Sequence, residues 1–208
     1  MSHGLMPNEV AEGTRSGLAP LARGLHRAGV TANAVTVLGV LVTIAGSALL
    51  ASGRPLAALV VLLAGALADT LDGQLAKAAG GGTRFGAFLD STLDRVSDAA
   101  LGCGAAALGA ALGDPLLFWS ALVGLVASFL VSYIRAKAES MGATAAVGLM
   151  PREARLMVLL IGVGLWGLFG LYPLFVATFA AVALLSVVTL FQRIAFVARE
   201  LRTTEGTR

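Results

Sequence analysis

The sequence predicts an all-α membrane protein with six transmembrane helices and an N-terminal amphipathic helix on the membrane surface. Two observations support this fold class. Hydrophobic residues make up 57% of the 208 residues and charged residues only 13%, whereas soluble domains carry about 25% charged residues. In addition, no Asp, Glu, Lys or Arg occurs between residues 156 and 192, and a helix crosses a bilayer with about 20 apolar residues.

The N-terminal segment is expected to lie outside the bilayer core. Residues 1–13 are polar and are predicted to be disordered. Over residues 14–29, leucines and alanines recur at helical spacing while arginines occupy other positions. This pattern is typical of an amphipathic helix that lies on the membrane with its arginines toward anionic headgroups. A solvated basic tail is the alternative for this segment.

Hydropathy then delimits six crossings within one membrane domain, which is predicted to span residues 14–200. The crossings are expected at about residues 34–52, 55–77, 84–112, 115–139, 152–169 and 173–199. Most of the connections between them contain Gly or Pro, which interrupt helices. Residues 201–208 are predicted to form a tail.

The distribution of basic residues predicts the orientation of the chain. Six crossings place both termini on one side, together with the connections near residues 80 and 145. Of the 15 Lys and Arg residues, all but Arg54 fall on or near that side. Because basic loops stay in the cytoplasm, we expect a multi-pass protein of the cell membrane with cytoplasmic termini. Basic and aromatic residues are not interleaved on a polar surface, so no nucleic-acid partner is expected.

Four aspartates form the most informative pattern in the chain. Asp69 and Asp72 are three residues apart, and Asp90 and Asp94 are four apart, so each pair lies on one face of a helix. A short connection joins the two predicted helices, which would bring both pairs together at the cytoplasmic end. Charged residues inside membrane helices are costly and usually functional. The pattern therefore predicts a cytoplasmic active site.

Divalent metal ions are the expected partners of these carboxylates, because four close negative charges repel one another. Oxygen ligands at this density suit Mg²⁺, with Mn²⁺ as the alternative. Two such ions held by shared carboxylates are a recurring arrangement in phosphoryl transfer. Gly73, which follows Asp72, would let a phosphate approach the helix closely; close helix packing is the alternative explanation for this glycine.

Residues 69–94 resemble the signature of the CDP-alcohol phosphotransferase family. The family pattern is D-x-x-D-G-x-x-A-R, a short gap, and G-x-x-x-D-x-x-x-D; the chain matches it except that Lys77 replaces the arginine. The resemblance implies that Asp69, Asp72, Asp90 and Asp94 hold two metal ions. It further implies that Asp94 is the catalytic general base and that CMP leaves from CDP-diacylglycerol.

The same resemblance implies which residues bind the two substrates. The residues expected to bind CDP-diacylglycerol are Asn33, Ala34, Val35, Thr36, Gly73, Lys77 and Thr83. The residues expected to bind the phosphate of the acceptor alcohol are Ser132, Arg135, Arg152, Arg155 and Arg193. So many cations near the cytoplasmic side favour a phosphorylated acceptor. The chain from about residue 16 to 200 is similar to actinobacterial members of the family that use inositol 3-phosphate.

Three alternatives to this function are open. The nearest alternative is a family member that uses glycerol 3-phosphate, and a distant one is a cation transporter whose acidic residues line an ion path. In a third reading the aspartates are structural and pair with Lys77, Arg84 and Arg95.

Asp98 lies outside the signature, and we expect it to pair helices, with Arg95 as its candidate partner. The family is generally homodimeric, and residues 99–113 could form the interface or pack within one subunit.

Overall fold

The computed structural model describes residues 8–145 and 147–205, and these residues form seven α-helices and no strand. The all-α class is therefore confirmed for the described part of the chain. The helices are α1 (Asn8–Arg27), α2 (Ala32–Ala51), α3 (Pro55–Ala78), α4 (Arg84–Leu112), α5 (Pro115–Ser140), α6 (Arg152–Phe169) and α7 (Tyr172–Glu205).

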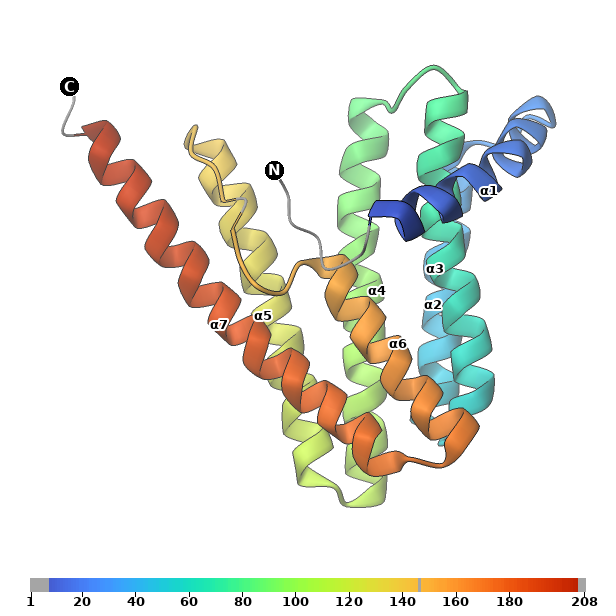
Figure 1. Ribbon diagram of the computed structural model, residues 1–208, viewed down its shortest axis with the longest axis vertical. Coiled ribbons are helices and arrows are strands. Elements are labelled where there is room, and N and C mark those ends of the chain that lie inside the picture. Colours follow the sequence, from blue (N-terminus) through green and yellow to red (C-terminus); the bar gives the residue numbers. More distant parts are fainter. Residues whose placement is uncertain (1–7, 146, 206–208) are drawn as a thin grey trace.

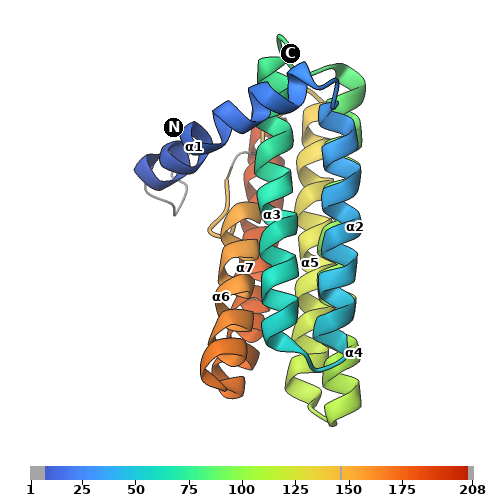
Figure 2. The same cartoon turned by 90° about the vertical axis from the view of Figure 1, so that its right-hand side faces the viewer.

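Helices α2 to α7 form a closed ring in which each helix packs against two others. Helix α2 lies between α3 and α4, helix α5 lies between α4 and α7, and helix α6 lies between α7 and α3 (Figure 1). Helix α1 packs against α3 and lies across one end of the ring (Figure 2). The ring order differs from the chain order, so α3 and α6 become neighbours.

The local sequence explains where the helices begin and end. The side chains of Thr31, Thr83 and Asp114 cap the N-termini of α2, α4 and α5 by accepting a backbone hydrogen bond, as Ser, Thr and Asp commonly do. Gly113 and Gly170 end α4 and α6 in the left-handed conformation, which glycine adopts without strain. The predicted breaks near residues 113 and 170 are thus confirmed.

Two expectations about the ends of the chain need correction. Helix α1 begins at Asn8, so residues 8–13, predicted to be disordered, are helical; residues 1–7 lie outside the described residues. Helix α7 continues to Glu205, into the predicted tail, because neither Gly nor Pro interrupts residues 174–205. Residues 206–208 lie outside the described part.

Four of the described helices have the length and hydropathy of membrane spans: Ala32–Ala51, Pro55–Ala78, Pro115–Ser140 and Tyr172–Thr203. Helices α4 and α6 complete the ring but carry clusters of charged residues near their N-termini. Helix α4 carries three aspartates and two arginines in its first half, and α6 has only 18 residues with three charges in its first turn. Several of these charges take part in the candidate site.

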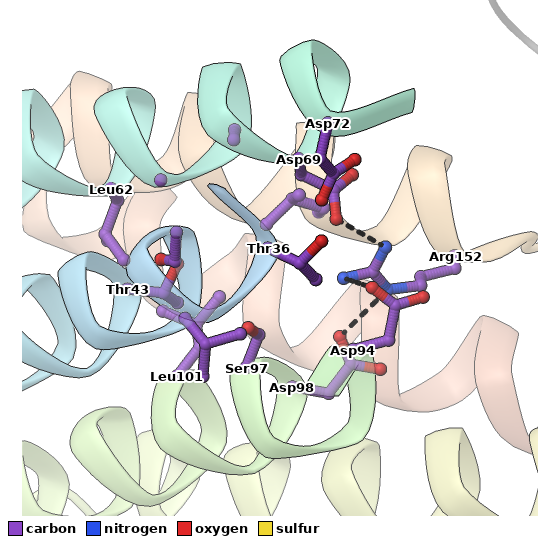
Figure 3. A pocket seen from close by; sticks show the side chains of 15 residues that line it. Thr36, Thr43, Leu62, Asp69, Asp72, Asp94, Ser97, Asp98, Leu101 and Arg152 are labelled. Atoms are coloured by element: carbon purple, nitrogen blue, oxygen red, sulfur yellow. Dashed lines mark hydrogen bonds and ion pairs between the residues drawn. The ribbon is translucent and has the colours of Figure 1, made fainter. Parts of the chain in front are cut away.

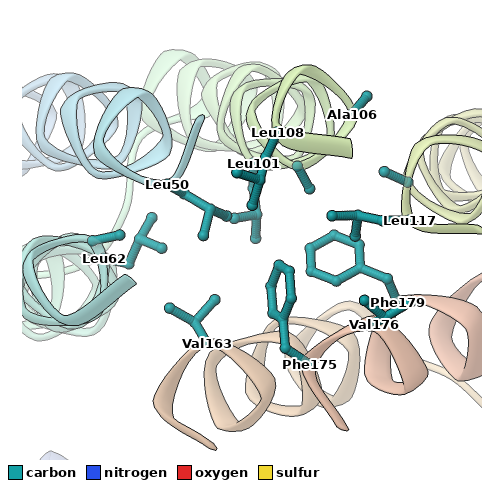
Figure 4. Close-up of a cluster of buried hydrophobic side chains, with 13 residues drawn as sticks. Leu50, Leu62, Leu101, Ala106, Leu108, Leu117, Val163, Phe175, Val176 and Phe179 are labelled. Atoms are coloured by element: carbon teal, nitrogen blue, oxygen red, sulfur yellow. The ribbon is translucent and has the colours of Figure 1, made fainter. Parts of the chain in front are cut away.

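The hydrophobic core lies at the end of the ring that is opposite to these charges. It contains side chains from all six ring helices, among them Leu50, Leu62, Leu117, Val163 and Phe175 (Figure 4). Leu50 and Phe175 are fully buried. Packing at this end holds the six helices together and leaves the charged end to form cavities.

Glycines allow several helices in the ring to approach closely. A Cβ atom on Gly109 would lie 2.7 Å from the backbone nitrogen of Phe118, so Gly109 packs against α5 within the same subunit. Gly104 similarly faces the carbonyl of Ser47 on α2. Gly104 and Gly109 therefore serve packing within one subunit, as small residues do in membrane bundles, whereas Cys103, Ala107 and Ala110 of the same segment are exposed. The predicted interface over residues 99–113 stays a prediction.

Candidate active site

Helices α3 and α4 bring three of the four predicted metal-binding aspartates together. One carboxylate oxygen from each of Asp69, Asp90 and Asp94 lies within 4.8 Å of the others. Asp94 is mostly buried, with 15% of its side chain exposed, whereas the side chain of Asp69 is 42% exposed. Oxygens at these separations can share one hard divalent cation.

Asp72 is the most buried of the four aspartates and is not among the three whose oxygens lie close together. Only 6% of its surface is exposed, and its Oδ2 atom is buried without a hydrogen-bond partner. A buried, unsatisfied carboxylate oxygen is costly. Asp72 shares one cavity with Asp69 and Asp94 and a second cavity with Asp90. The donor set thus fits divalent metal ions.

Arg152 at the start of α6 is the principal cation among these carboxylates. Its Nη2 atom lies 2.8 Å from Asp94 Oδ1 and its Nη1 atom 3.6 Å from Asp69 Oδ1 (Figure 3). Its Nε atom lies 3.5 Å from Oδ1 of Asp98. The guanidinium therefore touches three carboxylates from two helices. Sequence reasoning placed Arg152 with the acceptor and did not foresee these contacts.

Lys77, Arg84 and Arg95, the expected partners of the aspartates if these are structural, make few contacts with them. Arg95 Nη1 contacts Asp94 Oδ2 at 3.4 Å. Among the described residues, neither Lys77 nor Arg84 forms an ion pair with these carboxylates. Asp98, for which Arg95 was the candidate partner, pairs instead with Arg152 and with Arg155, whose Nη2 atom lies 3.7 Å from Asp98 Oδ2. The reason is that the arginines in the first turn of α6 reach across the interior of the ring to the acidic face of α4.

A large cavity opens next to the aspartates, between the first turns of α2 and α4 and the last turns of α1 and α3. Its volume is about 530 Å³. Four of the residues predicted to bind CDP-diacylglycerol line it, namely Asn33, Thr36, Gly73 and Thr83. Ala34, Val35 and Lys77 do not line it: Val35 is buried against α1 and α3, and Lys77 is exposed.

Other residues of this cavity were missed by sequence reasoning. His26 lies in the last turn of α1, Gly29 lies in the connection that follows it, and Thr31 caps α2. Gly81 and Gly82 belong to the α3–α4 connection. The run of three glycines was a visible signal, but the contribution of α1 was not, because α1 reaches the cavity only by packing against α3. The N-termini of α2 and α4 both face the cavity, and helix N-termini attract anions.

The five predicted acceptor-binding residues fall into two groups. Arg152 lies among the aspartates, and Arg155 lies one turn further along α6, with 5% of its surface exposed. Ser132, Arg135 and Arg193 lie elsewhere on α5 and α7. Arg135 pairs with Glu139 on the surface at 2.9 Å. The structure thus places Arg152 and Arg155 beside the acidic residues and does not bring the other three into direct contact with them.

Arg193 is part of a docking strip on α7 that holds the α5–α6 connection. Its Nε donates to the carbonyl of Val147 and its Nη1 to the carbonyl of Val131, both at 2.8 Å. Nearby, the side chains of Thr189 and Gln192 accept from the backbone N–H groups of Met150 and Leu149, respectively. The connection therefore runs back along α7, and α6 starts part of the way down the ring (Figure 1).

This descent of the connection explains how Arg152 reaches Asp94. Asp94 lies ten residues into α4, which corresponds to a depth of about 15 Å along the helix. A connection that ended level with the end of α5 would leave the first turn of α6 above the aspartates. Arg155 Nη1 also donates to the carbonyl of Met150 at 3.1 Å, so the same connection is held from the α6 side.

Comparisons with known proteins give a consistent result. The sequence model of CDP-alcohol phosphatidyltransferases matches residues 29–201 of this chain. A phosphatidylinositol phosphate synthase of Mycobacterium tuberculosis is 42% identical over 147 residues, which cover 70% of this chain and 68% of that protein. The crystal structure of the M. tuberculosis phosphatidylinositol phosphate synthase with CDP-DAG bound has a TM-score of 0.81 and 39% sequence identity, covering 86% of this chain and 92% of that chain.

A second structure of that M. tuberculosis enzyme is in complex with manganese and citrate. Its TM-score is 0.80 at 39% identity, and the match covers 86% of this chain and 88% of that chain.

Proposed function

Since this chain belongs to the CDP-alcohol phosphatidyltransferase family, we propose that it transfers the phosphatidyl group of CDP-diacylglycerol to inositol 3-phosphate and releases CMP. The observation that carries the proposal is the position of the clustered oxygens of Asp69, Asp90 and Asp94 beside a cavity of about 530 Å³. Similarity to the M. tuberculosis phosphatidylinositol phosphate synthase over most of the chain favours this acceptor.

The cavity between α2 and α4 is the proposed site for the cytidine diphosphate group. The free backbone N–H groups at the start of both helices favour a pyrophosphate there. Asn33, Thr36, Gly73 and Thr83 line the cavity. Gly73 has open space around it, so a phosphate or ribose can approach the backbone of α3. In this proposal Ala34, Val35 and Lys77 act from the edge of the site.

The aspartates at positions 69, 72, 90 and 94 would hold two Mg²⁺ ions, with Mn²⁺ as the alternative. When bound, such ions neutralise charge on the pyrophosphate and on the transferred phosphoryl group. The unsatisfied Oδ2 of Asp72 and the close oxygens of the other three support this assignment.

Asp94 is the proposed general base. It accepts the proton of the acceptor hydroxyl, whose oxygen then bonds to the phosphorus that carries diacylglycerol. The bond between this phosphorus and the bridging oxygen of the pyrophosphate breaks, and CMP leaves with that oxygen. Asp94 suits this role because it is mostly buried, because it lies within the group of close carboxylate oxygens, and because Arg95 contacts its other oxygen.

The acceptor phosphate would bind beside Asp94, where Arg152 and Arg155 supply charge-assisted hydrogen bonds. Ser132, Arg135 and Arg193 are proposed to complete this site from α5 and α7. In the membrane, all six ring helices would cross the bilayer, with α1 on the cytoplasmic surface and both termini and the active site in the cytoplasm. The positive charge of that side supports this orientation. We also propose that the enzyme is a homodimer.

Release of CMP from CDP-diacylglycerol tests the assignment. The purified protein would receive Mg²⁺ and either inositol 3-phosphate, glycerol 3-phosphate or inositol. We expect release with inositol 3-phosphate and little with the other two, since inositol lacks the phosphate and glycerol 3-phosphate lacks the ring. Release with glycerol 3-phosphate alone would reject the acceptor while keeping the family chemistry. Transport of cations in proteoliposomes without release of CMP would reject both.

A further inference from the structure

Arg152 occupies a position that a bound metal ion would contest. Its guanidinium contacts Oδ1 of Asp69 and Oδ1 of Asp94, and both residues belong to the group whose oxygens lie within 4.8 Å of one another. Only 19% of the Arg152 side chain is exposed, so water screens it weakly. A divalent ion between these carboxylates would repel the guanidinium at close range.

Asp98 offers the guanidinium an alternative partner. It lies one turn beyond Asp94 on α4 and outside the family signature, and its Oδ1 is 3.5 Å from Nε of Arg152. The side chain of Asp98 is 19% exposed, and its other oxygen faces Arg155. A rotation of the Arg152 side chain toward Asp98 would release Asp69 and Asp94 while keeping the positive charge paired and beside the site.

We propose that Arg152 is the internal counter-cation of the metal-binding carboxylates, that a divalent ion displaces it from Asp69 and Asp94, and that Asp98 positions the displaced guanidinium for the acceptor phosphate. The inference rests on the proposed function in so far as that function supplies a metal and a phosphorylated acceptor. Metal binding and acceptor binding are then coupled through one side chain, and such coupling acts equally in both directions.

Metal binding in the absence of substrates tests the first half of the proposal. Mn²⁺ would be titrated into purified protein and free Mn²⁺ followed by electron paramagnetic resonance, for the unmodified chain, Arg152→Gln and Arg155→Gln. We expect Arg152→Gln to lower the Mn²⁺ Kd about tenfold, since removing one charge-assisted contact is worth at least that factor. Arg155→Gln is the matched control, because it removes the same charge one turn away without touching Asp69 or Asp94.

Two results would overturn this half: an unchanged or weaker Mn²⁺ affinity in Arg152→Gln, or an equal gain in Arg155→Gln, which would indicate a general effect of charge. Arg152→Lys guards against loss of folding. Lysine keeps the charge but lacks the planar fork that reaches several carboxylates at once. Its Mn²⁺ Kd should fall between those of the unmodified protein and Arg152→Gln, and a Kd at either extreme counts against displacement.

Asp98→Asn tests the second half. Without this anion the displaced guanidinium loses its partner, so the KM for inositol 3-phosphate should rise at least several-fold while the KM for CDP-diacylglycerol stays the same. An equal rise in both KM values would show a merely structural role and reject the positioning role of Asp98. Because the Mn²⁺ titration contains no substrate, a wrong acceptor assignment would leave its result intact.

Discussion

The hydroxyl of Thr189 on α7 accepts a hydrogen bond from the backbone N–H of Met150, with 3.1 Å between nitrogen and oxygen. Both residues are buried, and Met150 lies two residues before Arg152. This bond is the last contact of the α7 docking strip before α6 begins. It therefore helps to set the depth at which Arg152 meets the aspartates.

Thr189→Val should loosen that attachment. Valine has the same shape but leaves the buried N–H of Met150 without an acceptor, which costs about 1–3 kcal/mol. We expect a lower melting temperature in detergent and a higher KM for the acceptor, with the KM for the donor little changed. The matched control is Thr178→Val on the same helix, whose hydroxyl donates to the carbonyl of Phe175 within α7. Similar kinetic effects in both variants would contradict the role of the docking strip.

Asp94→Asn should abolish turnover. The amide keeps the size of the side chain but cannot take a proton from the acceptor, and general-base catalysis typically contributes about 10²–10⁴-fold in rate. CMP release measures the loss, while elution volume and circular dichroism check the fold. Glu153→Gln, an exposed change of the same chemistry on α6, should retain activity. Substantial turnover in Asp94→Asn would remove the general-base assignment.

Gly73→Ala should weaken binding of CDP-diacylglycerol without lowering the stability of the protein. A Cβ atom at Gly73 meets nothing within 4 Å, and alanine favours helix over glycine by about 0.5–1 kcal/mol, so the protein should not lose stability. The methyl group would enter the cavity between α2 and α4 and raise the KM for CDP-diacylglycerol by about tenfold, as overpacking of about 1–3 kcal/mol implies.

Gly164→Ala on α6 is the control for this change. Its Cβ atom would make only ordinary contacts with Leu59, at 3.7 Å and beyond, and it lies far along α6 from Arg152. This variant should match Gly73→Ala in stability without any change in donor KM. If Gly73→Ala bound CDP-diacylglycerol normally, the cavity would not be the donor site.

Asp114 lies at the end of the ring opposite to the candidate site, and its charge should make the free energy of unfolding depend on pH. The carboxylate accepts from the backbone N–H of Leu117 at 3.0 Å and from the hydroxyl of Tyr172 at 2.8 Å. These bonds, the first above all, hold the pKa of Asp114 below its ordinary value of 3.8. Because the pKa of Asp114 is lower in the folded than in the unfolded protein, its carboxylate adds to the free energy of unfolding above pH 3.8. This contribution is lost as the pH falls through the folded pKa.

Thermal unfolding of the unmodified protein and Asp114→Asn between pH 6 and pH 3 measures this effect. Asparagine also caps helices. The free energy of unfolding of Asp114→Asn should therefore differ from that of the unmodified protein by no more than about 1 kcal/mol at pH 6, and this difference should shrink below pH 3.8. Tyr172→Phe, which removes one donor, should reduce the pH dependence. Parallel curves for the unmodified protein and Asp114→Asn would count against the charged cap.

The spacing of residues along the chain was enough to predict the helices and one half of the site. Glycine and proline mark the breaks, and the predicted crossing at residues 84–112 coincides with α4. The spacings of Asp69 with Asp72 and of Asp90 with Asp94 correctly placed each pair on one helical face. These inferences succeed because they depend on contacts within a single helix, where the geometry of the backbone is known in advance.

Only the tertiary structure decided which charges meet. Arg152 pairs with Asp94 and Asp98, and Arg193 holds Val147 instead of standing among the aspartates. Both facts follow from the order of helices in the ring and from the descent of the α5–α6 connection along α7. Residues that are more than 40 positions apart come together by packing between helices. Charge and hydropathy restrict such packing to one end of the membrane, but they leave many pairings of similar energy, and side-chain shape across the whole ring selects among them.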